Sequence, residues 1–260
     1  MPYAASHAHE REKACRTGRL TELIHQPIFH GRRRIGGGIT RYGYVFRDRH
    51  EAGVMLADKL HKFKGLKDVL VLALPRGGVV VGYAIAHHLR VPLDVFVTHK
   101  LGFPGQPELA MGAVSETGAV VLNPTLAAQV SKKYVDREVE NQKEEIARRT
   151  KLYREGKRVQ GLRGKIIILV DDGLATGATA KAAIETLKHE KPKELIVAVP
   201  VAPEDTALEF ERLVNEFVCL ERDPFFYALG AYYEDFSQVS DEEVTDLLRK
   251  ASREWEREGA

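Results

Sequence analysis

The order of apolar and polar residues along the chain predicts helices and strands in alternation. A helix is expected after Asp48, a suitable N-cap, because apolar residues then recur at helical spacing: Ala52, Met55, Leu56, Leu60 and Phe63. The continuous apolar run at residues 69–74 predicts a buried strand, and a second helix is expected over about residues 79–89. This succession of a buried strand and a helix is the first sign of an α/β protein.

Three further apolar runs predict buried strands, at residues 93–97, 165–170 and 195–201. Strands made almost entirely of Val, Ile and Leu are typical of parallel sheets that are covered on both faces. We therefore predict an α/β fold with a mostly parallel sheet and helices on both sides. Such sheets bind ligands at the carboxyl ends of their strands, so the residues that follow each strand are the first candidates for a site.

Turn residues and charges predict the remaining elements. Residues 99–112 are rich in Gly and Pro and indicate a long flexible loop, and Thr117-Gly118 indicates a hairpin turn between two short strands. Ser240 begins an S-x-x-E capping box, so a last helix is expected from there.

A strongly charged segment predicts one long helix at about residues 125–155, opened by Asn123-Pro124. Opposite charges recur in it at a spacing of four residues, in the pairs Glu144/Arg148 and Glu145/Arg149. Such pairs stabilise an exposed helix surface, and we interpret this face as solvated and not as a binding site.

The first 40 residues show no helical or strand periodicity and include Gly36-Gly37-Gly38. Residues 1–50 carry ten Lys and Arg against four acidic residues, although the whole chain has a net charge of only +2. We predict a basic, flexible arm over residues 1–40 and a folded domain over residues 41–260. The arm has no interleaved stacking aromatics and no helix-turn-helix pattern, so we do not expect nucleic acid as a partner.

Composition indicates a soluble protein that can fill a core, since 44% of the 260 residues are hydrophobic and 29% are charged. The two cysteines are too few for a disulfide framework, which favours a reducing compartment. No apolar run approaches the roughly 18 residues that span a bilayer, and the first residues lack the apolar core of a secretory signal. We predict a cytoplasmic location and no membrane contact.

The strongest candidate site follows the predicted strand at 165–170, in the sequence IIILVDDGLATGATA. The strand delivers two adjacent carboxylates, Asp171 and Asp172, to its open end. Small and hydroxyl-bearing residues then turn the chain into a helix: Gly173, Ala175, Thr176, Gly177, Ala178 and Thr179. Small residues let backbone N–H groups approach an anion, and a helix N-terminus adds its unpaired N–H groups and positive dipole end.

Phosphate is therefore the expected ligand of the turn at residues 175–179. Carboxylates repel phosphate but suit sugar hydroxyls, or the water ligands of a Mg²⁺ ion. A phosphate at one end and a diol at the other describe a ribose 5-phosphate. A buried strand with an ordinary turn after it is the alternative, whereas no dinucleotide or P-loop motif follows a strand here.

These residues resemble the phosphoribosyl pyrophosphate motif of the type I phosphoribosyltransferases, in which two acids precede a Thr-Gly-x-Thr turn. Over about residues 46–240 the chain is similar to members with LPRGG, KLG…PELAMGA and DDGLATGAT blocks. The resemblance implies a Rossmann-like sheet with a small hood that binds the acceptor, here about residues 220–240. It also implies a homo-oligomer that uses Mg²⁺ and phosphoribosyl pyrophosphate and forms a nucleotide with release of pyrophosphate.

The resemblance also assigns roles to residues outside the turn. Pyrophosphate is expected on Arg76, Gly77, Gly78 and Lys100, and the family often has a cis peptide bond at the place of Pro75–Arg76. Catalysis is implied for Lys100, Asp171 and Asp172, and the two aspartates are implied as Mg²⁺ ligands through water. The segment from Asp223 to Phe236 holds the aromatics of the candidate hood, which either stack a base or pack beneath it.

One departure from the family leaves the acceptor open. The hypoxanthine–guanine enzymes have a third acid three residues after the second, and Ala175 stands there in this chain. A 6-oxopurine acceptor therefore loses support, although a nucleobase or another nitrogen nucleophile remains possible. Two other functions stay open: a regulator that binds phosphoribosyl pyrophosphate or a nucleotide without catalysis, and an enzyme that hydrolyses the pyrophosphate ester without an acceptor.

Overall fold

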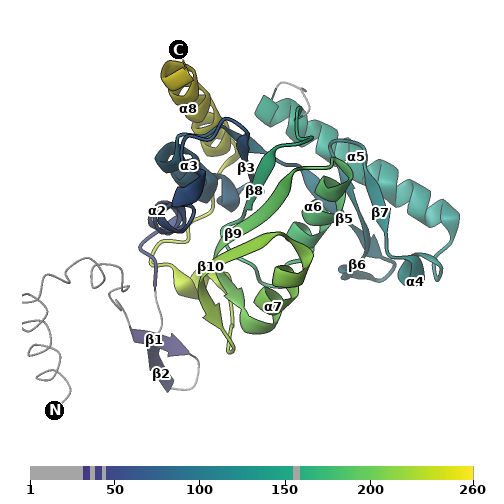
Figure 1. Cartoon of the computed structure of the whole chain (residues 1–260). Coiled ribbons are helices and arrows are strands. Elements are labelled where there is room, and N and C mark those ends of the chain that lie inside the picture. The colour runs from purple at the N-terminus through teal and green to yellow at the C-terminus, as the bar shows by residue number, and fades with distance from the viewer. Residues whose placement is uncertain (1–31, 36–38, 43–44, 155–158, 260) are drawn as a thin grey trace, which may run out of the picture. The chain divides into compact units, whose positions relative to one another are not determined.

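The computed structural model of the chain describes residues 32–35, 39–42, 45–154 and 159–259, and the chain divides into two units, Met1–Tyr44 and Val45–Ala260 (Figure 1). The described part of the first unit is an antiparallel hairpin of β1 (Arg32–Ile35) and β2 (Ile39–Tyr42). Strand β1 and the start of β2 lie within the arm predicted over residues 1–40, whose sequence shows no strand periodicity. The two strands, RRRI and ITRY, have no alternating apolar face, so no pattern indicated them. The rest of the predicted arm lies outside the described residues.

The second unit is built on the predicted parallel sheet. Its strands are β3 (Val69–Ala73), β4 (Leu93–Val95), β8 (Ile166–Val170), β9 (Glu194–Pro203) and β10 (Glu216–Asp223). They lie in the order β10-β9-β8-β3-β4, and each neighbouring pair is parallel. The mostly parallel sheet expected from the continuous apolar runs is confirmed.

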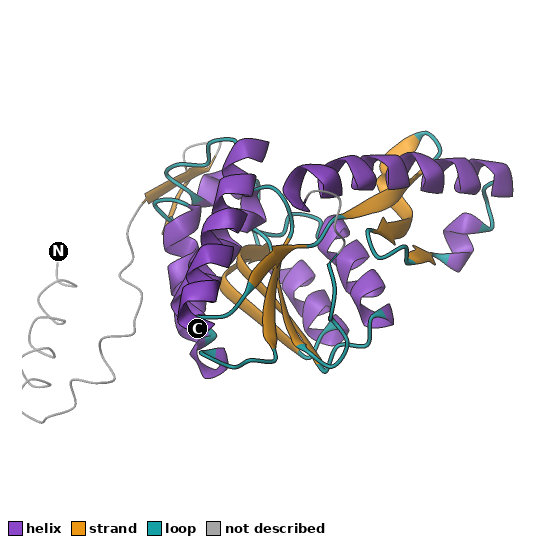
Figure 2. Cartoon of the chain, turned by 90° about the horizontal axis from the view of Figure 1, so that it is seen from above, coloured by secondary structure: helices purple, strands orange, loops and turns teal. Residues whose placement is uncertain are grey.

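Helices cover both faces of this sheet, as expected (Figure 2). Side chains alternate between the faces along β3: Val69 and Val71 belong to the hydrophobic cluster that includes α2 (Arg49–Lys59) and α3 (Gly77–Leu89). Leu70 and Leu72 belong to the cluster that includes α6 (Ala178–His189) and α7 (Glu204–Leu213). Two apolar faces explain why the strands read as continuous apolar runs.

Two helix starts occur where capping residues predicted them. Asp48 caps α2, and its carboxylate accepts a hydrogen bond from the backbone N–H of Glu51 at 2.8 Å. Ser240 precedes α8 (Asp241–Gly259), and its Oγ accepts from the N–H of Glu243 at 3.1 Å. Each oxygen satisfies one of the N–H groups that a helix start leaves unpaired.

An antiparallel sheet of β5 (Thr98–Phe103), β6 (Gln106–Ser115) and β7 (Val120–Leu122) lies in the order β5-β6-β7. It corrects the expectation of a loop at 99–112, because β5 and β6 form a hairpin whose register shifts near Gly102. Leu101 and Met111 are fully buried, so an inward face exists that the surrounding glycines and prolines concealed. The turn at Thr117-Gly118 is confirmed, with Gly118 at φ +89°.

The charged segment forms two helices, α4 (Pro124–Ala127) and α5 (Lys132–Arg154). Val135, Ile146 and Tyr153 are buried and turn one face of α5 toward the rest of this unit. Two 3-10 helices complete the second unit, η1 (His61–Phe63) and η2 (Leu229–Tyr232). None of the described helices combines the length and apolar character that crossing a membrane requires.

The path of the chain reverses between β3 and β8, which are neighbours in the sheet. From β3 the chain passes through α3 to β4 on one side, and from β8 it passes through α6 to β9 on the other. The ends of the two strands are level, because the N–H of Leu74 donates to the carbonyl of Val170 at 2.8 Å. In open α/β sheets such a switch point is where ligands bind.

Candidate functional site

The turn after β8 presents unpaired backbone N–H groups beside the start of α6. Ala175, Thr176 and Thr179 are exposed, and the N–H groups of Ala175, Thr176 and Gly177 make no hydrogen bond to any described residue. Gly177 caps α6 at φ +68°, and a Cβ there would lie 2.7 Å from the ring of Phe210. Only glycine fits this conformation and this close approach. The geometry suits an anion at the helix N-terminus.

The two aspartates lie at the end of β8, but not in the open position that we expected. Oδ2 of Asp172 accepts a hydrogen bond from Nε of Arg49 at 2.8 Å, and the Asp172 side chain is only 14% exposed. Oδ1 of Asp171 accepts from the N–H of Asp172 at 2.9 Å. Burial raises the pKa of Asp171 well above its ordinary value, and the charge of Asp172 raises it further.

Arg49 is a site residue that the sequence did not reveal. It is the first residue of α2, and its Nη1 also donates to the carbonyl of Ser237 at 2.9 Å. Its guanidinium lies 3.9 Å from the centre of the Phe236 ring. Arg49 thus joins the start of α2 to the acid pair and to the segment before α8. Its partner Asp172 is 123 residues away, so no local pattern indicated the contact.

The loop after β3 packs against the acid pair. The Pro75–Arg76 peptide bond is cis, as the resemblance suggested. A Cβ on Gly77 would collide with the carboxylate of Asp172, and one on Gly78 would lie 2.9 Å from the carbonyl oxygen of Val170. The two glycines therefore bring the backbone of one strand end against the carboxylates of the other.

Lys100 reaches the same region from β5. It lines a cavity of about 240 Å³ together with Pro75, His99, Arg149 and Thr179. Lys100 of the hairpin, the loop after β3 and the start of α6 therefore line the same cavity. The structure brings together the three segments that the resemblance assigned to a pyrophosphorylated ribose.

His99 extends the wall of this cavity in its neutral form. Nδ1 of His99 lies 2.8 Å from Oε1 of Gln142, and Nε2 is buried without a hydrogen-bond partner among the described residues. Burial lowers the pKa of His99, and the positive charge of Arg149 lowers it further. A neutral imidazole adds no charge to the hollow that Lys100 lines.

A larger cavity of about 590 Å³ lies beside the loop after β3. Residues of four segments line it, among them Arg49, Arg76, Gly77, Arg148, Arg149 and Phe236. Arg148 and Arg149 of the charged helix lie on this cavity and are partly exposed, at 58% and 32%. Local charge pairing in the sequence does not show what lies opposite a helix. The volume falls within the range typical of small-molecule sites.

The aromatics of the candidate hood divide between two environments. Tyr232 and Tyr233 are buried, and the hydroxyl of Tyr233 donates to the backbone carbonyl of Asp172 at 2.7 Å. Phe225 and Tyr227 are 58% and 84% exposed. Tyr233 thus supports the strand end that carries the acids, while the exposed ring of Tyr227 can stack on a flat ligand.

Comparisons with known proteins agree with this geometry. The sequence matches the family described as "Phosphoribosyl transferase domain" over residues 50–236. Over 218 residues it is 42% identical to proteins of Mycobacterium tuberculosis strains CDC 1551 and H37Rv, both named provisionally as phosphoribosyl transferases. The match covers 83% of this chain and 49% of each relative, so the chain spans about half their length.

A solved structure shares the fold at a similar level of identity. The crystal structure of TT1426 from Thermus thermophilus superposes with a TM-score of 0.73 at 41% sequence identity. The superposition covers 79% of this chain and 98% of that chain. The match over residues 50–236 includes the turn after β8, the loop after β3 and Lys100. The chain therefore belongs to the phosphoribosyl transferase domain family and has the fold of the type I phosphoribosyltransferases.

Proposed function

We propose that the chain binds phosphoribosyl pyrophosphate and transfers its ribose 5-phosphate to a nitrogen nucleophile, with release of pyrophosphate. One observation carries the proposal: the small-residue turn of residues 175–179 and the loop of residues 75–78 meet at the switch point between β3 and β8. The first offers N–H groups for one phosphate, the second offers N–H groups and Arg76 for others, and two carboxylates lie between them.

Each part of the substrate has a complementary set of groups. The 5-phosphate is assigned to Gly173 and residues 175–179, and the ribose hydroxyls to Asp171 and Asp172, because carboxylates accept hydrogen bonds from hydroxyls. The pyrophosphate is assigned to Arg76, Gly77, Gly78 and Lys100. Lys100 and Thr179 line the same cavity, as a ligand with phosphate at both ends requires.

The two aspartates fit a Mg²⁺ ion whose other ligands are mostly water molecules and substrate oxygens. The described residues contain no group of three or more metal-ligating side chains, and one oxygen of Asp172 is already bonded to Arg49. Mg²⁺ commonly binds in this way, through one or two carboxylates and the substrate's phosphates. When bound, the ion would neutralise charge on the leaving pyrophosphate.

The chain's own charges stabilise both halves of the breaking bond. Positive charge develops at the anomeric carbon as pyrophosphate departs, and the carboxylate of Asp172 lies on the ribose side. Negative charge grows on the leaving group, where Arg76 and Lys100 provide cations. The acceptor is assigned to the candidate hood, where the ring of Tyr227 is 84% exposed.

Phosphorus NMR with phosphoribosyl pyrophosphate, Mg²⁺ and a panel of nucleobases and amines tests the reaction. We expect pyrophosphate release that depends on one acceptor. Lys100→Ala should slow release more than it weakens binding, because the charge that it meets grows in the transition state. Lys193→Ala is the matched control, since Lys193 precedes the amino end of β9, away from the carboxyl ends of the strands, and pairs with Asp68.

Two other outcomes would contradict the proposal. Tight binding with no release for any acceptor would favour the regulator, and release without an acceptor would favour hydrolysis. Equal rates of pyrophosphate release for Lys100→Ala and Lys193→Ala would show that Lys100 takes no part in the reaction.

A further inference from the structure

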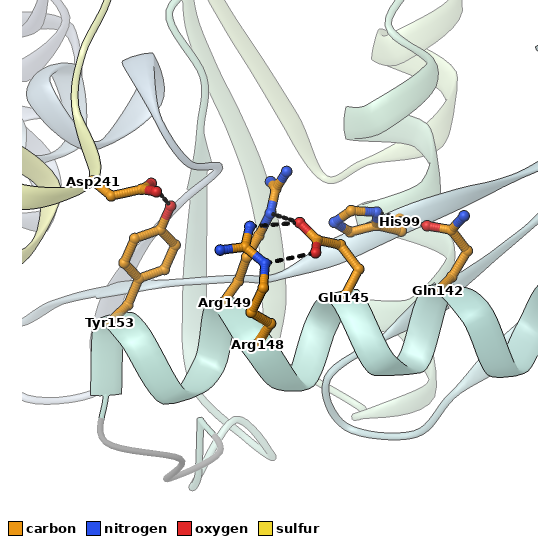
Figure 3. Close-up of polar contacts among 7 residues, drawn as sticks. All are labelled: His99, Gln142, Glu145, Arg148, Arg149, Tyr153 and Asp241. Carbon is orange, nitrogen blue, oxygen red and sulfur yellow. Dashed lines mark hydrogen bonds and ion pairs between the residues drawn. The ribbon is translucent and has the colours of Figure 1, made fainter.

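Polar side chains project from one face of α5 toward His99 and Asp241 (Figure 3). Gln142, Glu145, Arg149 and Tyr153 follow one another at spacings of three or four residues, which places them on one side of a helix. Gln142 contacts His99 of β5, and the hydroxyl of Tyr153 donates to Asp241 of α8 at 2.6 Å. The helix is therefore held on both sides of its arginines.

Arg148 and Arg149 share a single carboxylate. Nε and Nη2 of Arg148 donate to Glu145 at 2.7 and 2.8 Å, and Nε of Arg149 donates to it at 2.9 Å (Figure 3). The hydrogen bonds from Arg148 are the main cause that lowers the pKa of Glu145 to about 2, so Glu145 is ionised at neutral pH. Two guanidinium cations therefore face one anion, and one positive charge remains without a counterion in this group.

These arginines are accessible and face further cations. Their side chains are 58% and 32% exposed, and both line the 590 Å³ cavity opposite the loop after β3. Arg76 lines the same cavity, and its guanidinium makes no hydrogen bond or ion pair with any described residue. Arg49 is occupied by Asp172, and the carboxylate of Asp241 is occupied by Tyr153. The cavity therefore has an excess of guanidinium donors over anions.

We propose that Arg148 and Arg149 form a phosphate-binding subsite for the pyrophosphate group of phosphoribosyl pyrophosphate, and that Glu145 orients them until that group binds. The inference rests on the proposed function and extends it to residues of α5. Pyrophosphate fits better than an anionic acceptor because Arg149 lines both the cavity of Arg76 and the cavity of Lys100, the two cations assigned to pyrophosphate. Forked guanidinium groups match phosphate oxygens in pairs.

Calorimetric titration of three ligands in the presence of Mg²⁺ tests the subsite: pyrophosphate, phosphoribosyl pyrophosphate and ribose 5-phosphate. In the double variant Arg148→Gln/Arg149→Gln we expect the first two to bind about tenfold or more weakly, because charge-assisted hydrogen bonds are lost. Ribose 5-phosphate lacks the pyrophosphate and should bind unchanged. Arg137→Gln, an exposed arginine of the same helix, is the matched control and should change none of the three.

A second variant should change the affinity for pyrophosphate in the opposite direction. Glu145→Gln removes the carboxylate that competes for both arginines, so pyrophosphate should bind more tightly than to the wild type. A purely structural role of Glu145 predicts weaker or unchanged binding, and this result would overturn the proposal.

The remaining outcomes separate the subsite from the proposed function. Unchanged pyrophosphate affinity in the double variant, or an equal loss for ribose 5-phosphate, would overturn the subsite. Wild-type protein that binds pyrophosphate through these arginines but does not bind phosphoribosyl pyrophosphate would support the subsite and contradict the proposed function. Wild-type protein that binds neither ligand would contradict both.

Discussion

The surroundings of Asp171 destabilise the ionised form of its carboxyl group. Its carboxyl group is buried beside a second carboxylate, and both features favour the protonated form, which is why its pKa is raised. The backbone N–H of Asp172 offsets part of this rise in pKa by donating a hydrogen bond to Oδ1 of Asp171. Perturbed carboxylates of this kind cluster at functional sites, and a ligand with hydroxyls or a cation would relieve the repulsion.

Replacing Asp171 by asparagine should make the free protein more stable at neutral pH, because asparagine keeps the Oδ1 acceptor and has no charge to bury. A raised pKa in the folded state means that the wild type loses stability as the pH rises above about 4, the ordinary value of an aspartate. The melting temperature of Asp171→Asn should exceed that of the wild type by about 2–4 °C at pH 7, as for about 1 kcal/mol in a domain of this size.

The difference in melting temperature should shrink as the pH falls toward 4, where both proteins carry a neutral side chain. Asp246→Asn is the control, because Asp246 is exposed and forms an ion pair with Arg249 on α8. A melting temperature for Asp171→Asn at or below that of the wild type at pH 7 would show that the buried charge does not destabilise the fold.

Helix α5 shows how one element brings residues into the site. Its last residue, Arg154, forms ion pairs with Asp94 of β4 and with Glu116, which lies between β6 and β7. Glu116 is buried and also accepts hydrogen bonds from the N–H groups of Val97 and Val159, at 2.8 and 3.1 Å. This cluster fixes the end of α5 that carries Arg148 and Arg149.

Glu116→Gln should therefore lower the free energy of unfolding by about 2–3 kcal/mol, because an amide NH₂ would replace an acceptor where all partners are donors. Urea unfolding measures the change. Glu140→Gln on the exposed side of α5 is the matched control, since its contact with Lys143 at 3.4 Å is exposed and of little energetic consequence. Equal stability of the two variants would show that the Glu116 cluster does not anchor the helix.

The sequence predicted those elements and residues whose signals are local. Four of the five parallel strands, the caps at Asp48 and Ser240 and the contiguous turn after β8 could be predicted because each is encoded within a few residues. Arg49 could not, since it meets Asp172 only in the folded chain. The hairpin at β5 and β6 was hidden because its glycines and prolines outweighed the alternation of Leu101 with its neighbours.

The whole molecule combines two units, and the described residues place the site within Val45–Ala260. The residues of the site come from the start of α2, from the carboxyl ends of β3 and β8, from β5 and α5, and from the segment before α8. Among the described residues, every buried hydrophobic side chain lies at Phe46 or beyond. The second unit therefore has its own core and meets the usual condition for folding alone.

Removing residues 1–44 should change the melting temperature by no more than about 2 °C, because surface changes away from the core cost little. Removal of residues 1–49 is the contrasting variant. It deletes Phe46, which bonds through its backbone to Tyr232 and Glu234 at 2.8 Å, together with the Asp48 cap and Arg49. We expect a large drop in melting temperature for this second deletion, and a similar drop for both would show that the first unit is needed for the fold.

Calorimetric titration of phosphoribosyl pyrophosphate in the presence of Mg²⁺ tests whether the switch point between β3 and β8 binds this ligand. We predict that the wild type binds it and that Asp171→Asn/Asp172→Asn loses about tenfold or more in affinity, as charge-assisted hydrogen bonds to the ribose are lost. The far-ultraviolet circular dichroism of the double variant should match the wild type. No binding by the wild type, or unchanged affinity in the double variant, would show that the switch point is not the binding site.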